Sequence, residues 1–448
     1  MDFAESVKYL YSLGNEVSSM KLGLDSIRIL INALGKPGFN YKKVQVAGTN
    51  GKGSVCAFLN AICISAGIKT GLYTSPHLIS VTERIKIDGV DINENEFAGI
   101  ASFVRETSEL LVARGSLESV PTYFEQLTAI ALVAFANHGV DLAILETGLG
   151  GRLDATTAAD AQFAAITPID YDHQEYLGET LGEIAAEKAA IIHAGSLVVI
   201  AEQKPEALAQ ILGRCSVLGI EPLLTEDVGG NTSSSECVWR DADRAIGDRA
   251  NSLPVEFPPI DFATKSGRFE NVRLGLPGRH QIENAKVAIL LAETLQDEFR
   301  ITSGNIVEGL QTARHPGRLE YSGKYLFDGA HNTSGATALR EYLDEFVDTP
   351  ITLVFGLMQG KDINAIGEIL FKKADNLILT QPENSRAVSP DEILEFVPQT
   401  LDKSSIFLTG NVQQALAKAS EVSGEDVLIV VTGSLYLVGE AKKILSQS

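Results

Sequence analysis

The glycine-rich stretch GTNGKGS, residues 48–54, contains the residue types that can hold a phosphate group. Glycines let backbone N–H groups come close to an anion, and Lys52 adds a positive charge that can reach phosphate oxygens. The spacing differs from the usual phosphate-binding loop, because Val46 stands where the first glycine is expected and Gly53 separates Lys52 from Ser54. The stretch is therefore either a nucleotide site of a different type or an ordinary glycine turn.

The flanking residues favour the nucleotide site. An apolar run, VQVA, precedes the glycines, and SVCAFLNAICIS follows them with the pattern of a helix. A strand, a glycine-rich turn and a helix in this order direct backbone N–H groups and the positive end of the helix dipole at a bound phosphate. Ser54 could also cap the helix, a role that is compatible with phosphate binding.

Three further polar residues follow apolar runs, and open α/β sheets bind ligands at the carboxyl ends of their strands. Glu146 ends DLAILE and precedes TGLGGR, His173 follows FAAITPI, and Ser75 lies in YTSPHL. Mg²⁺ takes a few hard oxygen donors, which makes the Glu146 carboxylate a candidate ligand. The alternatives are a strand-end charge, a structural histidine and a turn serine.

Lys188 and the stretch DGAHN require separate interpretations. The helical pattern of EIAAEKAAII predicts that Lys188 extends from an apolar helix to solvent. Further along, Asp328, His331 and Asn332 cluster after the apolar YLF. Arg318 precedes them at a predicted hinge, where its guanidinium could reach nucleotide phosphates. Capping and turn roles are equally compatible with this second cluster.

The elements that must position these residues form two α/β series. The apolar runs DLAILE, FAAITPI and SLVVIAE, separated by helix-like segments, predict buried parallel strands with crossover helices. We expect an α/β protein with an N-terminal P-loop-type, mostly parallel sheet and flanking helices over residues 1–313. A linker at 314–318 and a smaller C-terminal Rossmann-like α/β domain over 319–448 should follow. Residues 222–275 predict an antiparallel excursion or insertion.

The overall composition argues against several classes of protein. The 448 residues carry a formal net charge of −21, which disfavours a nucleic-acid partner because phosphate backbones require basic surfaces. The apolar runs are too short to span a membrane, and the N-terminal residues lack the pattern of a secretory signal. The four cysteines show no CxxC spacing, which indicates neither a zinc site nor a disulfide framework. We therefore expect a cytoplasmic protein whose partners are small molecules.

Taken together, the motifs resemble the folylpolyglutamate synthase/dihydrofolate synthase family of the Mur ligase superfamily. Any one motif is weak evidence, whereas twelve in the order of the family, over nearly the whole chain, are specific. These twelve are GTNGKGS (48–54), TSPHL (74–78), VTERIKIDG (81–89), TYFEQLTAIAL (122–132), ETGLGGRLDAT (146–156), DHQEYLG (172–178), EKAAII (187–192), LPGRHQIENA (276–285), HPGRLE (315–320), DGAHN (328–332), FGLMQGKD (355–362) and VTGSLYLVGEA (431–441).

The resemblance implies an ATP-binding loop and a magnesium centre. ATP would be held by Gly48, Thr49, Asn50, Gly51, Lys52, Gly53, Ser54, Asn284, Arg318 and Asp328. Mg²⁺, expected at two sites, would be held through Ser75, Glu146 and His173. The amine of Lys188 would be carbamylated and would become an anion that helps the second metal site. The catalytic residues would be Lys52, Lys188, His173 and His331.

The resemblance also implies the two organic substrates. Dihydropteroate or a reduced folate would bind at Thr122, Tyr123, Phe124, Glu125, Arg152, Leu153 and Asp154. L-glutamate would contact Ser434 and His331. The implied enzyme uses ATP to convert the acceptor carboxylate into an acyl phosphate, which the amine of L-glutamate then attacks. Bacterial members of the family often accept both dihydropteroate and folates, and the family is usually monomeric, so we expect a bifunctional monomer.

Three other functions stay open at this point: a ligase of the same superfamily with another carboxylate acceptor, a P-loop kinase, and a non-catalytic nucleotide-binding regulator. This chain also departs from the family pattern. Thr157 stands where the family usually has asparagine, Ala190 where it has glycine, and His193 where it has lysine, and residues 222–262 match none of its motifs. The balance between dihydrofolate synthase and folylpolyglutamate synthase activity is not readable from these residues.

Overall fold

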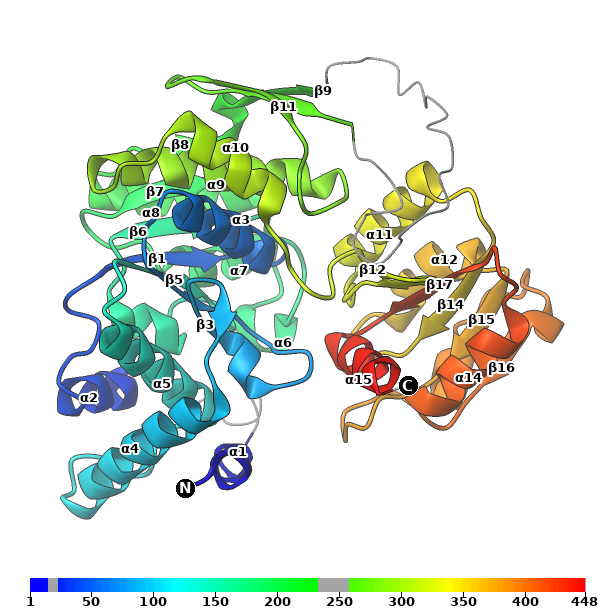
Figure 1. Cartoon of the computed structure of the whole chain (residues 1–448), viewed down its shortest axis with the longest axis horizontal. Coiled ribbons are helices and arrows are strands. Elements are labelled where there is room, and N and C mark those ends of the chain that lie inside the picture. The colour runs from blue at the N-terminus through cyan, green and yellow to red at the C-terminus, as the bar shows by residue number, and fades with distance from the viewer. Residues whose placement is uncertain (15–22, 233–257, 448) are drawn as a thin grey trace. The chain divides into compact units, whose positions relative to one another are not determined.

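The structure, a computed structural model, describes residues 1–14, 23–232 and 258–447. The chain forms two compact α/β units (Figure 1). The predicted fold class is confirmed, because one unit contains a large, mostly parallel sheet and the other a smaller one. The first unit consists of Met1–Gly229, Phe262–Val272 and Glu283–Ala313, and the second of Gly230–Asp261, Arg273–Ile282 and Arg314–Ser448.

The first unit is built on an eight-stranded sheet with the order β4-β3-β2-β5-β1-β6-β7-β8. Its strands are β1 (Lys42–Ala47), β2 (Thr70–Tyr73), β3 (Ile85–Ile87), β4 (Val90–Asp91), β5 (Leu142–Glu146), β6 (Phe163–Ile166), β7 (Leu197–Ile200) and β8 (Leu223–Leu224). All are parallel except β3 and β4, which pair antiparallel at one edge. The loops after the parallel strands therefore meet along one end of the sheet, where such sheets bind ligands.

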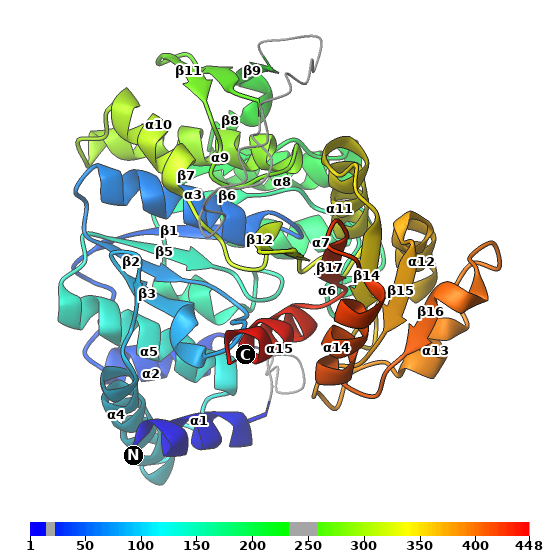
Figure 2. The same cartoon turned by 45° about the vertical axis from the view of Figure 1, so that its right-hand side comes forward.

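Helices cover both faces of this sheet, because parallel strands need crossover connections. Figures 1 and 2 place α3 and α10 on one side of β1 and β5, and α2 and α5 on the other. None of the helices in the described ranges combines the length and hydropathy that crossing a membrane requires. The helices are α1 (Phe3–Ser12), α2 (Asp25–Ala33), α3 (Lys52–Ser65), α4 (Glu94–Ala113), α5 (Tyr123–His138), α6 (Gln174–Leu177), α7 (Leu181–Ala189), α8 (Pro205–Leu218), α9 (His280–Thr294) and α10 (Ser303–Thr312).

Two apolar clusters fill the core of the first unit beside α5 and α7. One cluster joins α1, α2, α4 and α5 to strand residues that include Leu145, and the other joins α7 and α8 to residues that include Ala47 and Ala164. Gln45 on β1 lies between them, because its neighbours in register are Leu145 on β5 and Ala164 on β6. This amide is fully buried, so the boundary between the clusters is polar.

The segment predicted as an excursion lies partly outside the described residues. Its described part contributes β8 to the large sheet and forms a separate three-stranded sheet, in the order β11-β10-β9. These strands are β9 (Gly229–Thr232), β10 (Ile260–Ala263) and β11 (Arg268–Val272). Residues 233–257, which include the serine-rich TSSSE apart from its threonine, are not described.

The second unit contains a six-stranded sheet with the order β12-β13-β17-β14-β15-β16. Only β12 is antiparallel to its neighbour, so the loops after the other strands again meet at one end. Its strands are β12 (Glu320–Ser322), β13 (Tyr325–Phe327), β14 (Ile351–Phe355), β15 (Asn376–Leu379), β16 (Ile406–Leu408) and β17 (Leu428–Thr432). Its helices are α11 (Thr333–Phe346), α12 (Ile363–Leu370), α13 (Pro390–Leu394), α14 (Val412–Val422) and α15 (Leu435–Ser446).

Candidate active site

The glycine loop follows β1 and leads directly into α3. Gly51 precedes the helix with a left-handed backbone at φ 86°, so it, and not Ser54, is the N-cap. A Cβ atom at Gly51 would lie 2.2 Å from Oδ1 of Asn284, and one at Gly48 would lie 1.8 Å from Oγ1 of Thr167. These distances leave no room for a side chain, so the close packing of the loop requires glycine at both positions.

The loop after β6 supports the glycine loop. The backbone N–H groups of Thr49 and Asn50 donate to the carbonyl oxygen of Pro168, at 3.1 and 3.3 Å. The hydroxyl of Thr49 donates to the carbonyl oxygen of Asp170 and accepts from its N–H, both at 3.0 Å. The two loops therefore form one hydrogen-bonded assembly at the carboxyl ends of β1 and β6.

Two lysine amines converge on one carbonyl oxygen of the glycine loop. Nζ of Lys52 donates to the carbonyl oxygens of Gly48 and Thr49, at 3.1 and 3.0 Å. Nζ of Lys188, on α7, donates to the same Gly48 oxygen at 2.8 Å. The helical pattern of the sequence predicted a solvent-facing Lys188, and that prediction is wrong, because the residue is 5% exposed. Its burial, together with the charge of Lys52, lowers the pKa of Lys188 to about 7.

The three residues expected to hold magnesium follow three different strands. Glu146 ends β5 beside β1, and its Oε2 accepts a hydrogen bond of 3.1 Å from the N–H of Ser75, which follows β2. His173 follows β6 with a positive φ of 52°, and its N–H donates to Oδ1 of Asp172 at 2.9 Å. Ser75 and Glu146 are thus in direct contact, and Glu146 is almost fully buried.

The segment expected to bind the acceptor starts α5 with a capping box. The hydroxyl of Thr122 accepts from the N–H of Glu125 at 3.4 Å, and Oε2 of Glu125 accepts from the N–H and hydroxyl of Thr122 at 2.7 and 2.8 Å. Tyr123 and Phe124 contribute rings next to this cap, with Phe124 lying 5.9 Å from the ring centroid of Tyr73. Both polar residues of the segment are therefore already engaged with each other.

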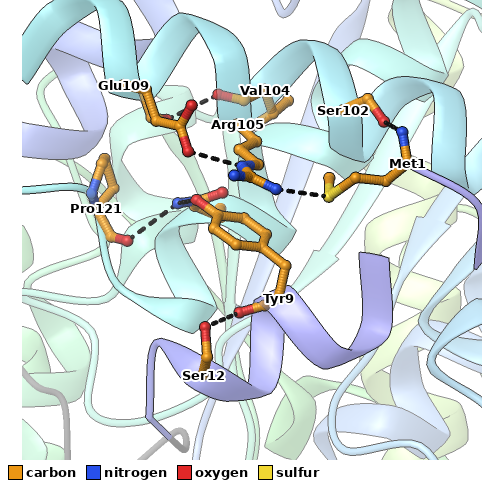
Figure 3. Close-up of polar contacts among 10 residues, drawn as sticks. Met1, Tyr9, Ser12, Ser102, Val104, Arg105, Glu109 and Pro121 are labelled. Atoms are coloured by element: carbon orange, nitrogen blue, oxygen red, sulfur yellow. Dashed lines mark hydrogen bonds and ion pairs between the residues drawn. The ribbon is translucent and has the colours of Figure 1, made fainter. Parts of the chain in front are cut away.

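A polar clamp holds α1 against this segment (Figure 3). The amide of Gln126 donates to the hydroxyl of Tyr9 on α1 at 2.8 Å, and the guanidinium of Arg105 on α4 lies over the ring of Tyr9 at 4.7 Å. Nε of Arg105 also donates to Glu109 at 2.7 Å. The clamp fixes the last turn of α1, where Tyr11 stacks on Tyr123 with a centroid distance of 5.7 Å.

Two further residues of this region were not predicted to belong to the site. Arg84, only 3% exposed, donates from Nε to Nδ1 of His77 at 2.8 Å and lies over the ring of Tyr123. Nε2 of His77 lies 3.2 Å from the hydroxyl of Tyr11. Burial and the neighbouring guanidinium lower the pKa of His77 to about 3, which keeps it neutral. Both residues lie in recognised motifs, but their burial is not visible in the sequence.

Residues 152–154 face different surroundings despite their adjacency. The side chain of Arg152 pairs with Glu187 at 2.8 Å, and Leu153 is 41% exposed. Asp154 is buried, and its carboxylate accepts from the N–H groups of Gly148 and Leu149 and from both donors of Thr156. Burial nevertheless raises the pKa of Asp154. The geometry assigns Asp154 to shaping the loop after β5.

The second unit places its polar cluster at the ends of β13 and β17. The carboxylate of Asp328 accepts from the N–H groups of Leu319 and Ala330, at 3.0 and 2.9 Å. Burial raises the pKa of Asp328, and the positive charge of Arg318 partly offsets this rise. Nδ1 of His331 lies 2.8 Å from the carbonyl oxygen of Gly329. Ser434, on the adjacent strand end, caps α15 by accepting from the N–H of Leu437.

Two family models match the chain: the Mur ligase middle domain over residues 46–292, and the C-terminal domain of dihydrofolate synthetase over residues 312–444. The dihydrofolate synthase/folylpolyglutamate synthase of Bacillus subtilis is 31% identical over 95% of this chain and 95% of its own length. The chain belongs to the folylpolyglutamate synthase/dihydrofolate synthase family. The predicted family is thus confirmed.

Two further relatives of this chain are longer proteins. A probable bifunctional folylpolyglutamate synthase/dihydropteroate synthase from Haloferax volcanii is 34% identical over 99% of this chain. Its counterpart from Halobacterium salinarum is 32% identical, also over 99% of this chain. The chain spans about half of each, 50% and 51% of their lengths.

Solved structures of other family members share the fold over the whole chain. The folylpolyglutamate synthase of Mycobacterium tuberculosis, complexed with ADP and AMPPCP, is 27% identical with a TM-score of 0.86 and covers 100% of both chains. Escherichia coli FolC, in complex with DHPP and ADP, is 26% identical with a TM-score of 0.83, over 100% of this chain and 98% of that one. The bifunctional enzyme of Yersinia pestis, complexed with AMPPNP and a manganese ion, is 26% identical with a TM-score of 0.82, over 100% of this chain and 98% of that one.

Proposed function

We propose that this family member is an ATP-dependent ligase that joins L-glutamate to dihydropteroate and to folates through an acyl phosphate. The observation that carries the proposal is the convergence of Lys52 and the buried Lys188 on the Gly48 carbonyl, in a loop beside the strand that ends in Glu146. Such a site combines the cation of Lys52 with the N-terminus of a helix, which is what a triphosphate requires. The relatives that bind ADP, AMPPCP or AMPPNP support the same substrate.

The residues proposed to bind ATP are those that the resemblance to the family implies. The loop residues Gly48 to Ser54 would hold its phosphates, with Asn284, whose side chain lies against Gly51, as a further ligand. Arg318 and Asp328 are proposed as ATP ligands on the resemblance alone. In this assignment residues 1–313 form the ATP-binding domain, 314–318 the linker, and 319–448 the C-terminal domain.

The residues around Glu146 fit a divalent metal ion that is completed by other ligands. In residues 1–14, 23–232 and 258–447 no three His, Cys, Asp or Glu side chains are grouped to hold a metal alone. Mg²⁺ commonly binds with one or two protein carboxylates together with phosphates and water, so Glu146 is proposed as its carboxylate ligand, with Ser75 and His173 as further ligands. The ion, proposed at two sites, would neutralise charge on the phosphates. The manganese complex of the Yersinia relative supports divalent metal use.

Lys188 is proposed to carry a carbamate. Only a neutral amine adds to CO₂, and burial gives Lys188 a pKa of about 7, so a large share of the amine is neutral at that pH. Carbamylation would replace a buried cation next to Lys52 by an anion, which removes the repulsion between the two amines. The new anion would lie close to Gly48 and could assist the second metal site.

Each step of the reaction then has a residue to support it. The acceptor carboxylate attacks the γ-phosphorus of ATP, which forms an acyl phosphate and releases ADP, and Lys52 stabilises the charge on the transferring group. The amine of L-glutamate attacks the acyl carbon, and phosphate leaves with the former carboxylate oxygen. His331 and Ser434 are proposed to contact the incoming glutamate.

The acceptor is proposed to bind at Thr122 to Glu125, near Arg152 to Asp154. The complex of Escherichia coli FolC with DHPP supports a pterin acceptor. The names of the full-length relatives support both activities, and we propose a bifunctional enzyme that acts as a cytoplasmic monomer. A different carboxylate acceptor is the second candidate, because Thr157, Ala190 and His193 depart from the pattern of the family.

The test is to mix the protein with ATP, Mg²⁺, L-glutamate and either dihydropteroate or tetrahydrofolate. We expect ADP and phosphate in both reactions, dihydrofolate in the first and a glutamate-extended folate in the second, measured by mass spectrometry. Glutamate-dependent ADP release only with another carboxylate would support the second candidate. A phosphorylated product that accumulates without glutamate would indicate a kinase, and the absence of ADP with every acceptor would refute the ligase assignment.

A further inference from the structure

Gln45 is a fully buried amide in the central strand β1, between Val44 and Val46 on a sheet that is otherwise apolar there. A buried amide destabilises a protein unless its hydrogen bonds are satisfied. The carbonyl oxygen of this amide, Oε1, has no partner among the described residues. Within the described part of the chain, the side-chain hydrogen bonds of Gln45 are therefore made by its NH₂ end alone.

The NH₂ group of Gln45 donates to two threonine hydroxyls. Its Nε2 lies 2.9 Å from Oγ1 of Thr156 and 2.8 Å from Oγ1 of Thr157, with Thr147 farther away at 3.4 Å. Each hydroxyl donates onward, Thr157 to the carbonyl oxygen of Gly151 at 2.7 Å and Thr156 to the carboxylate of Asp154. A carbonyl and a carboxylate can only accept, so both hydroxyls must accept from Gln45, which fixes the orientation of its amide.

The hydrogen bonds that run through Thr156 and through Thr157 both end on the loop that follows Glu146. Asp154 binds the N–H groups of Gly148 and Leu149 near the start of this loop, and Thr157 binds Gly151 at its centre. This loop also packs closely against the C-terminal end of α7. A Cβ atom at Gly151 would lie 2.7 and 2.8 Å from the carbonyl oxygens of Glu187 and Lys188.

These contacts form a closed ring. The backbone N–H of Arg152 donates to the carbonyl oxygen of Glu187 at 2.9 Å, which joins the loop to α7. The side chain of Lys188 returns to Gly48 at 2.8 Å, and Gly48 stands three residues after Gln45 in the same chain segment. The ring thus runs from β1 through the threonines and the loop to α7, and back to the residue after β1.

We propose that Gln45 is a positioning residue for Lys188 and Glu146, acting through Thr156 and Thr157. The inference rests on the proposed ligase function and adds to it a residue that does not touch the substrates. Thr157 is suited to this role because its hydroxyl both accepts and donates. An asparagine at this position offers the same pair of groups, which makes Thr157→Asn the conservative variant.

The test compares Gln45→Met and Thr157→Val with Thr157→Asn in the glutamate ligation assay. Displacing a reacting group by about 1 Å can cost up to about 10²-fold in rate, so we expect kcat to fall about 10- to 10²-fold in the first two variants. The KM for ATP should change little, because the glycine loop keeps its contacts with Pro168 and Asp170. Thr157→Asn should keep kcat within a few-fold of the wild type.

Thr70→Val is the matched control for Thr157→Val. Thr70 is a fully buried threonine on the parallel strand β2, and its hydroxyl has no partner among the described residues. The control should leave kcat unchanged. A purely structural role for Gln45 predicts lower thermal stability with a wild-type kcat for the folded protein, and that result would overturn the proposal.

A second readout does not depend on activity. Acetic anhydride, applied in CO₂-free buffer, acetylates exposed neutral amines, and peptide mass spectrometry gives the rate at Lys188 relative to Lys42. We expect a several-fold faster reaction at Lys188 in Gln45→Met and Thr157→Val, because the amine loses its fixed place at Gly48. An unchanged acetylation rate at Lys188 in both variants would contradict the positioning role, whether or not the protein is a ligase. A wild type that is inactive in the ligation assay would refute only the ligase assignment.

Discussion

The two units stabilise the loops after β1 and β13 with side chains of opposite type. Lysine amines bind the first loop, and a carboxylate binds the second. In the first unit, the ammonium group of Lys52 and the buried amine of Lys188 donate to carbonyl oxygens of the loop after β1. In the second unit, the carboxylate of Asp328, after β13, accepts from the N–H groups of Leu319 and Ala330. Both loops follow strands that have neighbours on both sides, β5 and β6 for β1, and β12 and β17 for β13. The contrast lies in the side chains that hold the two loops.

This contrast separates the roles that the loops can take. The first loop occupies its carbonyl oxygens with lysine amines and leads into the N-terminus of α3, where the helix dipole favours an anion. The second loop uses its N–H groups on an internal carboxylate and is therefore a poor site for phosphate by itself. This contrast supports the proposal that the first loop binds the triphosphate, while Asp328 organises the backbone of the second loop.

The largest effect should come from removing the cation of the first loop. In Lys52→Ala, we expect kcat to fall about 10²- to 10³-fold, as for the loss of one donor that stabilises developing charge. The measurement is steady-state ADP release with saturating acceptor and glutamate. Lys42→Ala, at the other end of β1 in an exposed pair with Glu298, should keep wild-type kcat. Equal loss in both variants would show a general effect of charge and not a loop-specific one.

Lys188→Ala should also abolish most turnover while leaving the fold intact, as seen by circular dichroism. If the carbamate is required, wild-type activity should fall in CO₂-free buffer and return with bicarbonate, whereas Lys188→Ala should not respond. Full activity of Lys188→Ala would remove the carbamate from the mechanism.

The buried amine of Lys188 also predicts a pH dependence of stability. Burial lowers the pKa of the folded group from 10.5 to about 7, so between these values the unfolded chain binds a proton that the folded chain lacks. Raising the pH from about 7 towards 10.5 should therefore stabilise the wild type relative to Lys188→Met, measured by urea unfolding in CO₂-free buffer. Parallel stability curves for the two proteins would contradict the lowered pKa.

A smaller effect is expected in the second unit. Asp328→Asn keeps the size of the side chain but leaves one of its two backbone N–H partners without an acceptor, which costs about 1–3 kcal/mol. Calorimetry should show a lower Tm. Asp402→Asn is a suitable control, because Asp402 caps an exposed turn and asparagine caps equally well. An unchanged Tm in Asp328→Asn would show that the carboxylate does not organise this loop.

The smallest effect concerns the acceptor segment. Thr122→Ala removes one side of the capping box of α5 and should cost about 1 kcal/mol of stability. Thr302→Ala removes the equivalent cap of α10, elsewhere in the same unit, and should cost a similar amount. If Thr122 also binds the acceptor, only Thr122→Ala should raise the KM for dihydropteroate. Equal KM values in the two variants would limit Thr122 to capping.

The fold and the loop were predictable because their signals are local. Alternating apolar runs and helical patterns identified β5, β6 and β7, and the strand-glycine-helix order identified the loop before α3. Glu146 was predicted at a strand end for the same reason. The signature Thr122-x-x-Glu125 also indicates a capping box, although we interpreted it only as an acceptor segment.

The residues whose surroundings were predicted wrongly or were not predicted are those that depend on tertiary packing. Lys188 lies on a helix whose pattern predicts an exposed lysine. The resemblance to the family implied a place in the site instead, and the packing of α7 against the loop after β5 accounts for the burial of the residue. Gln45 gives no signal in a run of four residues, VQVA, because its partners Thr156 and Thr157 are more than 100 residues away. The roles proposed for the acceptor and glutamate residues stay predictions.

The most direct test of the account is to follow the oxygen atoms of the acceptor. Dihydropteroate with both carboxylate oxygens replaced by ¹⁸O is incubated with the protein, ATP, Mg²⁺ and L-glutamate, and the released phosphate is analysed by mass spectrometry. An acyl phosphate predicts one ¹⁸O atom in each phosphate and one in the new amide. Unlabelled phosphate, formed together with dihydrofolate, would contradict activation of the acceptor by phosphoryl transfer.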